Sequence, residues 1–76
     1  MKVDWFVTGT VTYKNSEIAS YAARWKGLTM DEAERALTKL VADHMRKRNV
    51  AGIGVTARAS SAAGQMILSK IETKDS

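Results

Sequence analysis

The chain has 76 residues and no cysteine, and its 12 lysines and arginines against eight acidic residues give a formal net charge of +4. A chain of this length forms one domain, here residues 1–76, and without cysteine it can hold neither a disulfide nor a thiolate zinc site. No segment approaches the roughly 20 apolar residues of a membrane span, and the amino terminus, MKVDWFVTG, lacks the long apolar stretch of a signal peptide. We therefore expect a cytoplasmic protein that makes no membrane contact.

Two strands are predicted at the start of the chain. Apolar residues alternate with polar ones, mostly threonines, over residues 3–13, and the same period of two returns over residues 20–26. The residues between them, KNSE at 14–17, are typical of a turn. The pattern predicts a hairpin with an aromatic inner face that includes Trp5, while Phe6 points outward.

A helix is predicted over residues 29–48. It begins with a capping box, in which Thr29 and Glu32 each satisfy a free backbone N–H. Steps of three and four residues then form one apolar stripe, which consists of Ala33, Leu37, Leu40, Val41 and His44. Acidic residues at the helix start and three bases at its end complement the helix dipole.

Two further strands are predicted after the helix. Apolar and polar residues alternate over residues 53–60, and MILSKI at 66–71 is rich in strand-forming residues. The order ββαββ predicts an α+β fold, a mostly antiparallel four-stranded sheet with one helix packed on one face. The expected core consists of Trp5, Tyr21, Trp25, Leu37, Leu40, Ile53 and Val55.

No residue stands out as a candidate for catalysis, metal binding or cofactor binding. His44 is the single histidine and lies in line with the apolar stripe, so we expect it to pack at the boundary of the core. Asp31 and Glu32 are explained by capping and the helix dipole. Gly52-Ile53-Gly54 leads from a helix into a strand, the reverse of a dinucleotide-binding fingerprint. We therefore expect a protein that is not an enzyme.

The segment DHMRKRN at 43–49 raises the question of nucleic-acid binding. Successive helical residues turn by about 100°, so its three bases would fan around the helix and could not all face one phosphate backbone. Asp43 could also pair with Lys47, four residues on. The cluster is therefore explained as a solvated helix end, although the glycines that follow Asn49 could leave it exposed to a partner.

Bases are also concentrated in the second half of the chain, where five occur between His44 and Ile71 without any acid. Outward strand parity gathers further bases beside threonines and Phe6. The candidate partner-binding residues are Phe6, Arg24, Lys26, Arg46, Lys47, Arg48, Arg58 and Lys70. Such residues suit an acidic protein surface or, as an alternative, nucleic acid. An ordinary solvated sheet face would also carry them.

The stretches WFVTGTVTY, TMDEAERAL and AGIGVTARAS together resemble small bacteriophage proteins that redirect host machinery. Among these, the chain most resembles the family of the phage T7 inhibitor of bacterial RNA polymerase. That family has a hairpin, a helix opened by a Thr-x-Asp-Glu-Ala run, and a strand entered through Ala-Gly and continued by Val-Thr. The resemblance implies that the third strand docks on an acidic patch of a host enzyme. In the family, two arginines after the Val-Thr pair make this contact, and here only Arg58 follows Val55-Thr56, one position displaced.

The last strand carries large aliphatic side chains on both parities, with Met66 and Leu68 on one side and Ile67 and Ile71 on the other. A strand with one face exposed to water should alternate apolar and polar side chains. Because this strand does not, both of its faces are expected to be covered. The pattern indicates a homodimer through residues 64–72, formed by edge pairing or by stacking of outer faces.

Overall fold

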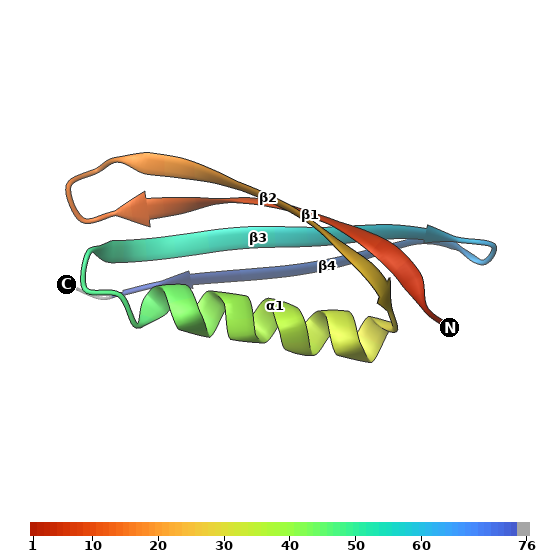
Figure 1. The fold of residues 1–76 in the computed structure, drawn as a ribbon. Coiled ribbons are helices and arrows are strands. Elements are labelled where there is room, and N and C mark those ends of the chain that lie inside the picture. The colour runs from red at the N-terminus through yellow and green to blue at the C-terminus, as the bar shows by residue number, and fades with distance from the viewer. Residues whose placement is uncertain (75–76) are drawn as a thin grey trace.

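The order of elements in the computed structural model, which describes residues 1–74, is ββαββ (Figure 1). The elements are β1 (Val3–Tyr13), β2 (Ile18–Leu28), α1 (Met30–Met45), β3 (Val50–Ser61) and β4 (Gly64–Thr73). The strands form one antiparallel sheet in the order β2-β1-β3-β4, so β2 and β4 are its edges. The predicted α+β fold is confirmed, and the molecule is elongated, measuring 43 by 18 by 17 Å.

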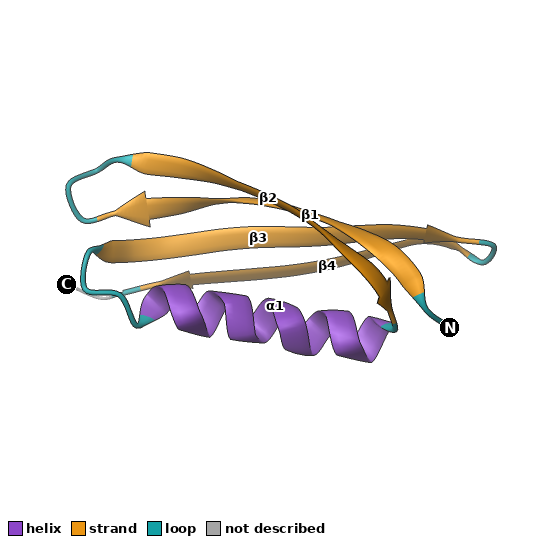
Figure 2. Cartoon of the chain, viewed as in Figure 1, coloured by secondary structure: helices purple, strands orange, loops and turns teal. Residues whose placement is uncertain are grey.

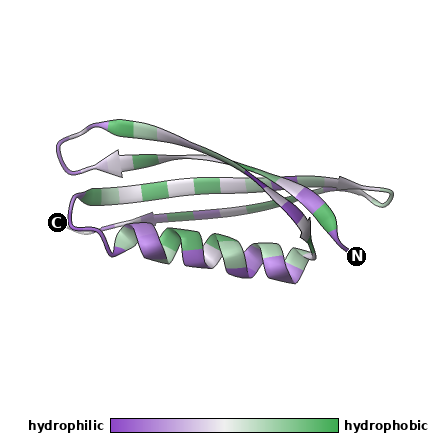
Figure 3. Cartoon of the chain, in the orientation of Figure 1, coloured by the Kyte–Doolittle hydropathy of each residue, from purple (hydrophilic) through white to green (hydrophobic). Residues whose placement is uncertain are grey.

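One face of the sheet packs against α1, which runs along the strands and lies closest to β3 and β4 (Figure 2). Along β3, Figure 3 shows apolar residues alternating with less hydrophobic ones. The apolar residues are buried beneath the helix. The buried core consists of Trp5, Val7, Val11, Ala33, Leu37, Val41, Val50, Ile53, Val55, Ala57 and Ala59. Of the predicted core residues, Tyr21, Trp25 and Leu40 are only partly buried, and they pack against this cluster.

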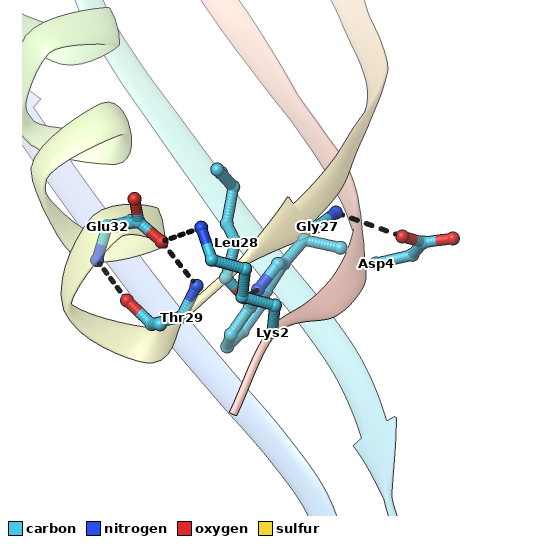
Figure 4. A network of polar contacts seen from close by, with 7 residues as sticks. Lys2, Asp4, Gly27, Leu28, Thr29 and Glu32 are labelled. Carbon is cyan, nitrogen blue, oxygen red and sulfur yellow. Dashed lines mark hydrogen bonds and ion pairs between the residues drawn. The ribbon is translucent and has the colours of Figure 1, made fainter.

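The start of α1 is fixed by the predicted capping box (Figure 4). The Glu32 N–H donates to Thr29 Oγ1 at 3.2 Å, and the Thr29 N–H donates to Glu32 Oε1 at 2.9 Å. Lys2 Nζ lies 3.5 Å from the same carboxylate oxygen. Next to this network the Gly27 N–H donates to Asp4 Oδ1 at 3.0 Å, where Gly27 adopts a φ of 68°. Glycine accommodates this left-handed conformation without strain, which lets β2 end and the helix begin within two residues.

The predicted helix end was wrong, because α1 stops at Met45 and not at residue 48. The chain turns at 46–49, where the Lys47 N–H donates to the His44 carbonyl at 3.1 Å. The Asn49 carbonyl accepts the Lys14 N–H at 2.8 Å, which ties this turn to the β1–β2 turn. The bases complement the helix dipole equally well from just beyond its end, so their charge did not reveal where it stops. Asp43 forms its ion pair with Arg46 and not with the expected Lys47.

The packing of α1 on the sheet predicts unequal effects for two neighbouring leucines. Leu37 is 1% exposed, so Leu37→Ala should lower the free energy of unfolding by about 2–5 kcal/mol, because it opens a cavity in the core. Leu40→Ala should lower it by less, because Leu40 is partly exposed. Urea denaturation followed by circular dichroism measures both changes. Equal unfolding midpoints for Leu37→Ala and the parent would contradict this packing.

The capping box also predicts a dependence of stability on pH. The hydrogen bond from the Thr29 backbone N–H, followed by that from its hydroxyl, lowers the pKa of Glu32 from its ordinary value of 4.5. A group whose pKa is lower in the folded state stabilises the fold above its unfolded pKa, and this contribution is lost as pH falls through the folded pKa. The parent should therefore lose stability as the pH falls below about 5 and through the lowered pKa of Glu32.

The matched variants are Glu32→Gln and Glu34→Gln, which remove one carboxylate each from the first turns of α1, at a half-buried and an exposed position respectively. Urea midpoints measured across this pH range should depend less on pH in Glu32→Gln than in the parent, because only Glu32 closes the capping box. The idea fails if Glu34→Gln flattens the dependence as much as Glu32→Gln does.

Candidate binding surface on the open sheet face

The face of the sheet turned away from α1 is uncovered within residues 1–74, and we call it the open face. Strand parity supplies its side chains, because the alternate residues of β1 and β3 are buried beneath the helix. Four exposed large apolar side chains lie on it, and they are Phe6, Ile18, Ile67 and Ile71. Exposed apolar side chains that gather on one face are typical of an interaction surface.

Two arginines flank the aromatic ring of the open face. The register of the strands places Phe6 opposite Arg24 of β2 on one side and opposite Arg58 of β3 on the other. The Arg24 guanidinium carbon lies 4.6 Å from the centroid of the Phe6 ring, within the range of a cation–π contact. We call these three residues the arginine–phenylalanine row. Ile67 of β4 extends it to the edge of the sheet, because it lies opposite Arg58.

The charges of the row are not neutralised by the rest of the described chain. The ion pairs formed within residues 1–74 are Lys2–Glu32 and Asp43–Arg46, so neither arginine of the row takes part in one. Asp4 lies beside the row, but its carboxylate accepts the Gly27 N–H. A shallow hollow lined by Phe6, Arg58, Ser60 and Gln65, among others, opens next to it. The row is therefore a cationic site with an apolar centre and free guanidinium donors.

Within residues 1–74, the other half of the open face carries no charged side chain. Two cross-strand rows lie there, one through Thr10, Gly54 and Ile71 and the other through Ile18, Thr12, Gly52 and Thr73. The two glycines form the floor of a shallow groove between the threonines of β1 and the side chains of β4. A Cβ built on Gly54 would lie 3.5 Å from Ile71 Cγ1, an ordinary contact, so the groove is open above this position.

The structure brings four of the predicted partner-binding residues together and separates the others. Phe6, Arg24 and Arg58 form the row, and Lys26 lies two residues after Arg24 and is exposed as well. Lys70 lies on the helix side of β4, because it is opposite the buried Val55. The structure therefore separates Lys70 from the open face, a separation that charge balance along the chain could not reveal because it takes no account of strand parity.

The bases at 46–48 lie in the turn that precedes β3, at the end of the molecule far from the row (Figure 1). Two further lysines join them there, because the Lys14 N–H donates to the Asn49 carbonyl and Lys74 Nζ donates to the Lys47 carbonyl at 2.6 Å. We call Lys14, Arg46, Lys47, Arg48 and Lys74 the basic end. Sequence reasoning missed both added lysines, because three segments distant in sequence meet only in the folded chain.

His44 occupies a packed position. Its ring meets Tyr21 edge to face with 6.1 Å between ring centroids, and its Nδ1 lies 3.0 Å from the Leu40 carbonyl oxygen. Among residues 1–74, no three side chains of histidine, cysteine, aspartate or glutamate lie together in a way that could hold a metal ion. Within the same residues, no helix has the length and apolar character needed to cross a membrane.

Comparison with protein-family models, with curated proteins and with solved structures finds no match to this chain.

Proposed function

We propose that this protein is a non-enzymatic binding module whose open face binds an acidic surface of another protein. The observation that carries this proposal is the arginine–phenylalanine row, in which Arg24 and Arg58 flank an exposed Phe6 and form no ion pair within residues 1–74. Arginine and aromatic side chains are enriched in protein interfaces and often supply most of the binding energy.

The geometry of the row suits carboxylates. Its residues project from adjacent strands of one sheet, so the backbone already holds them in place before a partner arrives. Stacking on Phe6 also restricts the Arg24 side chain, which reduces the conformational entropy lost on binding. A guanidinium group can donate two parallel hydrogen bonds to one carboxylate, so two arginines can hold two acidic side chains of a partner.

The apolar side chains around the row favour a protein partner over nucleic acid. Ile67 ends the row, and Ile18 and Ile71 stand on the uncharged half of the same face, each more than half exposed. Aliphatic side chains gain by burial against apolar groups of another protein but contribute nothing to phosphate recognition. Arg24 already lies over the Phe6 ring, so that ring is less free to stack on a nucleobase.

The resemblance to bacteriophage host-takeover proteins narrows the proposal to a protein of a phage or mobile element that binds a host enzyme. Arg58, which follows Val55-Thr56, lies on the central strand β3 and is exposed on the open face. This position is consistent with the docking role that the resemblance implies for an arginine of the third strand.

Charge reversal on the open face tests the proposal. The double variant Arg24→Glu, Arg58→Glu should lose a bacterial protein that the immobilised parent captures from nuclease-treated lysate, because it presents acids to an acidic partner. The matched control is Arg35→Glu, Lys39→Glu, which makes the same charge change on the exposed side of α1 and should capture normally. Quantitative mass spectrometry compares the captures. Equal capture by all three proteins would exclude the row as the binding site.

The basic end favours nucleic acid as a second candidate ligand. Five bases from three segments meet there, and Arg46 alone is paired with an acid among the described residues. Phosphate binding requires such convergence of positive charge, and the sequence alone showed only part of it.

Fluorescence anisotropy with labelled DNA tests this second candidate. If the basic end binds phosphates, affinity should fall steeply between about 50 mM and about 200 mM salt, because binding releases counterions. Lys47→Ala and Arg48→Ala should each reduce the slope of this salt dependence by about one, whereas Arg24→Ala should leave it unchanged. The absence of binding at low salt would remove the candidate.

A further inference from the structure

The edge strand β4 presents its backbone groups to solvent in a fixed alternation. The Lys74 N–H donates to the Ala51 carbonyl at 2.9 Å, which makes these two residues a hydrogen-bonded pair of the β3–β4 ladder. In an antiparallel ladder such pairs alternate with pairs whose N–H and C=O groups point away. The even-numbered residues of β4 therefore bond to β3, and the odd-numbered residues from Gln65 to Thr73 direct their backbone groups outward from the sheet.

These same odd-numbered residues place their side chains on the open face. They are Gln65, Ile67, Ser69, Ile71 and Thr73, and none of them is charged. Ile67 is 55% exposed and Ile71 is 79% exposed. β4 has ten residues and no proline, and its charged residues, Lys70 and Glu72, are even-numbered. On the open face its outer edge therefore carries only uncharged side chains, with aliphatic ones beside free hydrogen-bonding groups. Such an edge is a template for pairing with another strand.

The opposite edge of the sheet differs in charge. The Tyr13 N–H donates to the Glu17 carbonyl, so the even-numbered residues of β2 direct their backbone groups outward by the same alternation. Arg24 is among them, and the exposed Lys26 follows where the register of the ladder shifts. Charged side chains on an edge strand oppose pairing with a second strand. The two edges are therefore unequal, and β4 is the one on which two copies of a basic chain can meet with the least repulsion.

We propose that β4 pairs antiparallel with β4 of a second copy about a two-fold axis at Ser69. This register matches residues 65–73 with 73–65, so it pairs nearly the whole strand and joins only residues whose backbone groups point outward. Ile67 of each copy lies opposite Ile71 of the other, and four isoleucines pack together on the open face at the seam. The arrangement is isologous, because each contact occurs twice.

The helix side of the seam is compatible with this register. Leu68 lies opposite Lys70 of the second copy, so the aliphatic part of the lysine covers the leucine while its ammonium group reaches water. A helix centred between β3 and β4 would lie about 5 Å from the seam, given a strand spacing of about 4.8 Å, and two such helices would lie about 10 Å apart. That is close to the usual distance between packed helices.

A different register, centred on Ile71, would pair Lys70 with Glu72 of the second copy. It would, however, join only residues 69–73, about half of the strand. Exposed ion pairs contribute little to stability, so two of them do not compensate for the backbone hydrogen bonds and the isoleucine packing that only the longer overlap provides. The longer register is therefore favoured.

The assembly shares Ile67 and Ile71 with the open face but leaves the arginine–phenylalanine row accessible, because Arg24, Phe6 and Arg58 lie on β2, β1 and β3 and not on the seam strand. The four strands of each copy would form one continuous eight-stranded sheet. Both arginine–phenylalanine rows would lie on the same uncovered side of it, so the dimer would present two equivalent sites.

Sedimentation equilibrium over a roughly hundredfold range of concentration tests the dimer. The parent should show twice its chain mass of 8.3 kDa at high concentration, and Ile71→Lys should sediment as a monomer with an unchanged circular dichroism spectrum, because position 71 is mostly exposed in one copy. The matched control is Ile18→Lys, which adds the same charge to the open face at the β2 edge and should remain dimeric. A monomeric parent at every concentration overturns the proposal. If Ile71→Lys and Ile18→Lys both produced monomers, the proposal would also be overturned, in favour of a dimer in which the open faces of two copies stack.

A single introduced cysteine tests the register, because the chain has none of its own. Hydrogen-bonded antiparallel pairs have Cα atoms about 5.5 Å apart, within the usual range for a disulfide. Ser69→Cys should therefore oxidise to a covalent dimer on non-reducing gels, whereas Ser20→Cys at the β2 edge should remain monomeric under the same conditions. Cross-linking through Ile71→Cys but not through Ser69→Cys would overturn the register centred on Ser69.

Discussion

The burial of Trp5 determines which side of the sheet remains open. Its side chain is fully buried, and its indole N–H donates to the Leu28 carbonyl at 3.1 Å, at the last residue of β2. The next residue, Thr29, caps α1, so this bond fixes the place where the chain leaves the sheet and enters the helix. Because neighbouring residues of a strand point to opposite faces, an inward Trp5 requires an outward Phe6. The aromatic centre of the candidate site is thus a consequence of how the helix is attached.

A second constraint aligns the two arginines with that ring. β1 and β3 approach closely at Gly9, where an added Cβ would lie only 2.2 Å from the Gly54 carbonyl oxygen. Only glycine fits such an approach, and it holds the two central strands in the register that places Arg58 opposite Phe6. The site and the core therefore depend on the same backbone geometry.

The sequence predicted the elements and their order because each carries a local signal: alternation in the strands, and the capping box and apolar stripe of the helix. Outward parity also predicted that Phe6, Arg24 and Arg58 lie on the same face of the sheet. It could not show that they form one row, because register depends on turn lengths and on irregularities such as that between Thr12 and Tyr13. The helix end was missed for a related reason, since its position depends on the tertiary contact between Asn49 and the β1–β2 turn.

The open face carries two kinds of side chain: threonines, which are compatible with exposure to water, and large apolar side chains, which are typical of a binding surface. Thr8, Thr10, Thr12 and Thr56 lie on its two central strands, and threonine satisfies the β-branched preference of strands while keeping a hydroxyl in water. A sheet face meant only to be solvated could consist of such residues throughout. The large apolar side chains depart from this pattern at Phe6, inside a cationic row, and at Ile67 and Ile71, on an uncharged edge. The row carries two arginines, whereas the side chains that β4 places on the open face carry no charge. The two surfaces therefore select different partners: an acidic protein for the row, and the same strand of a second copy for the edge.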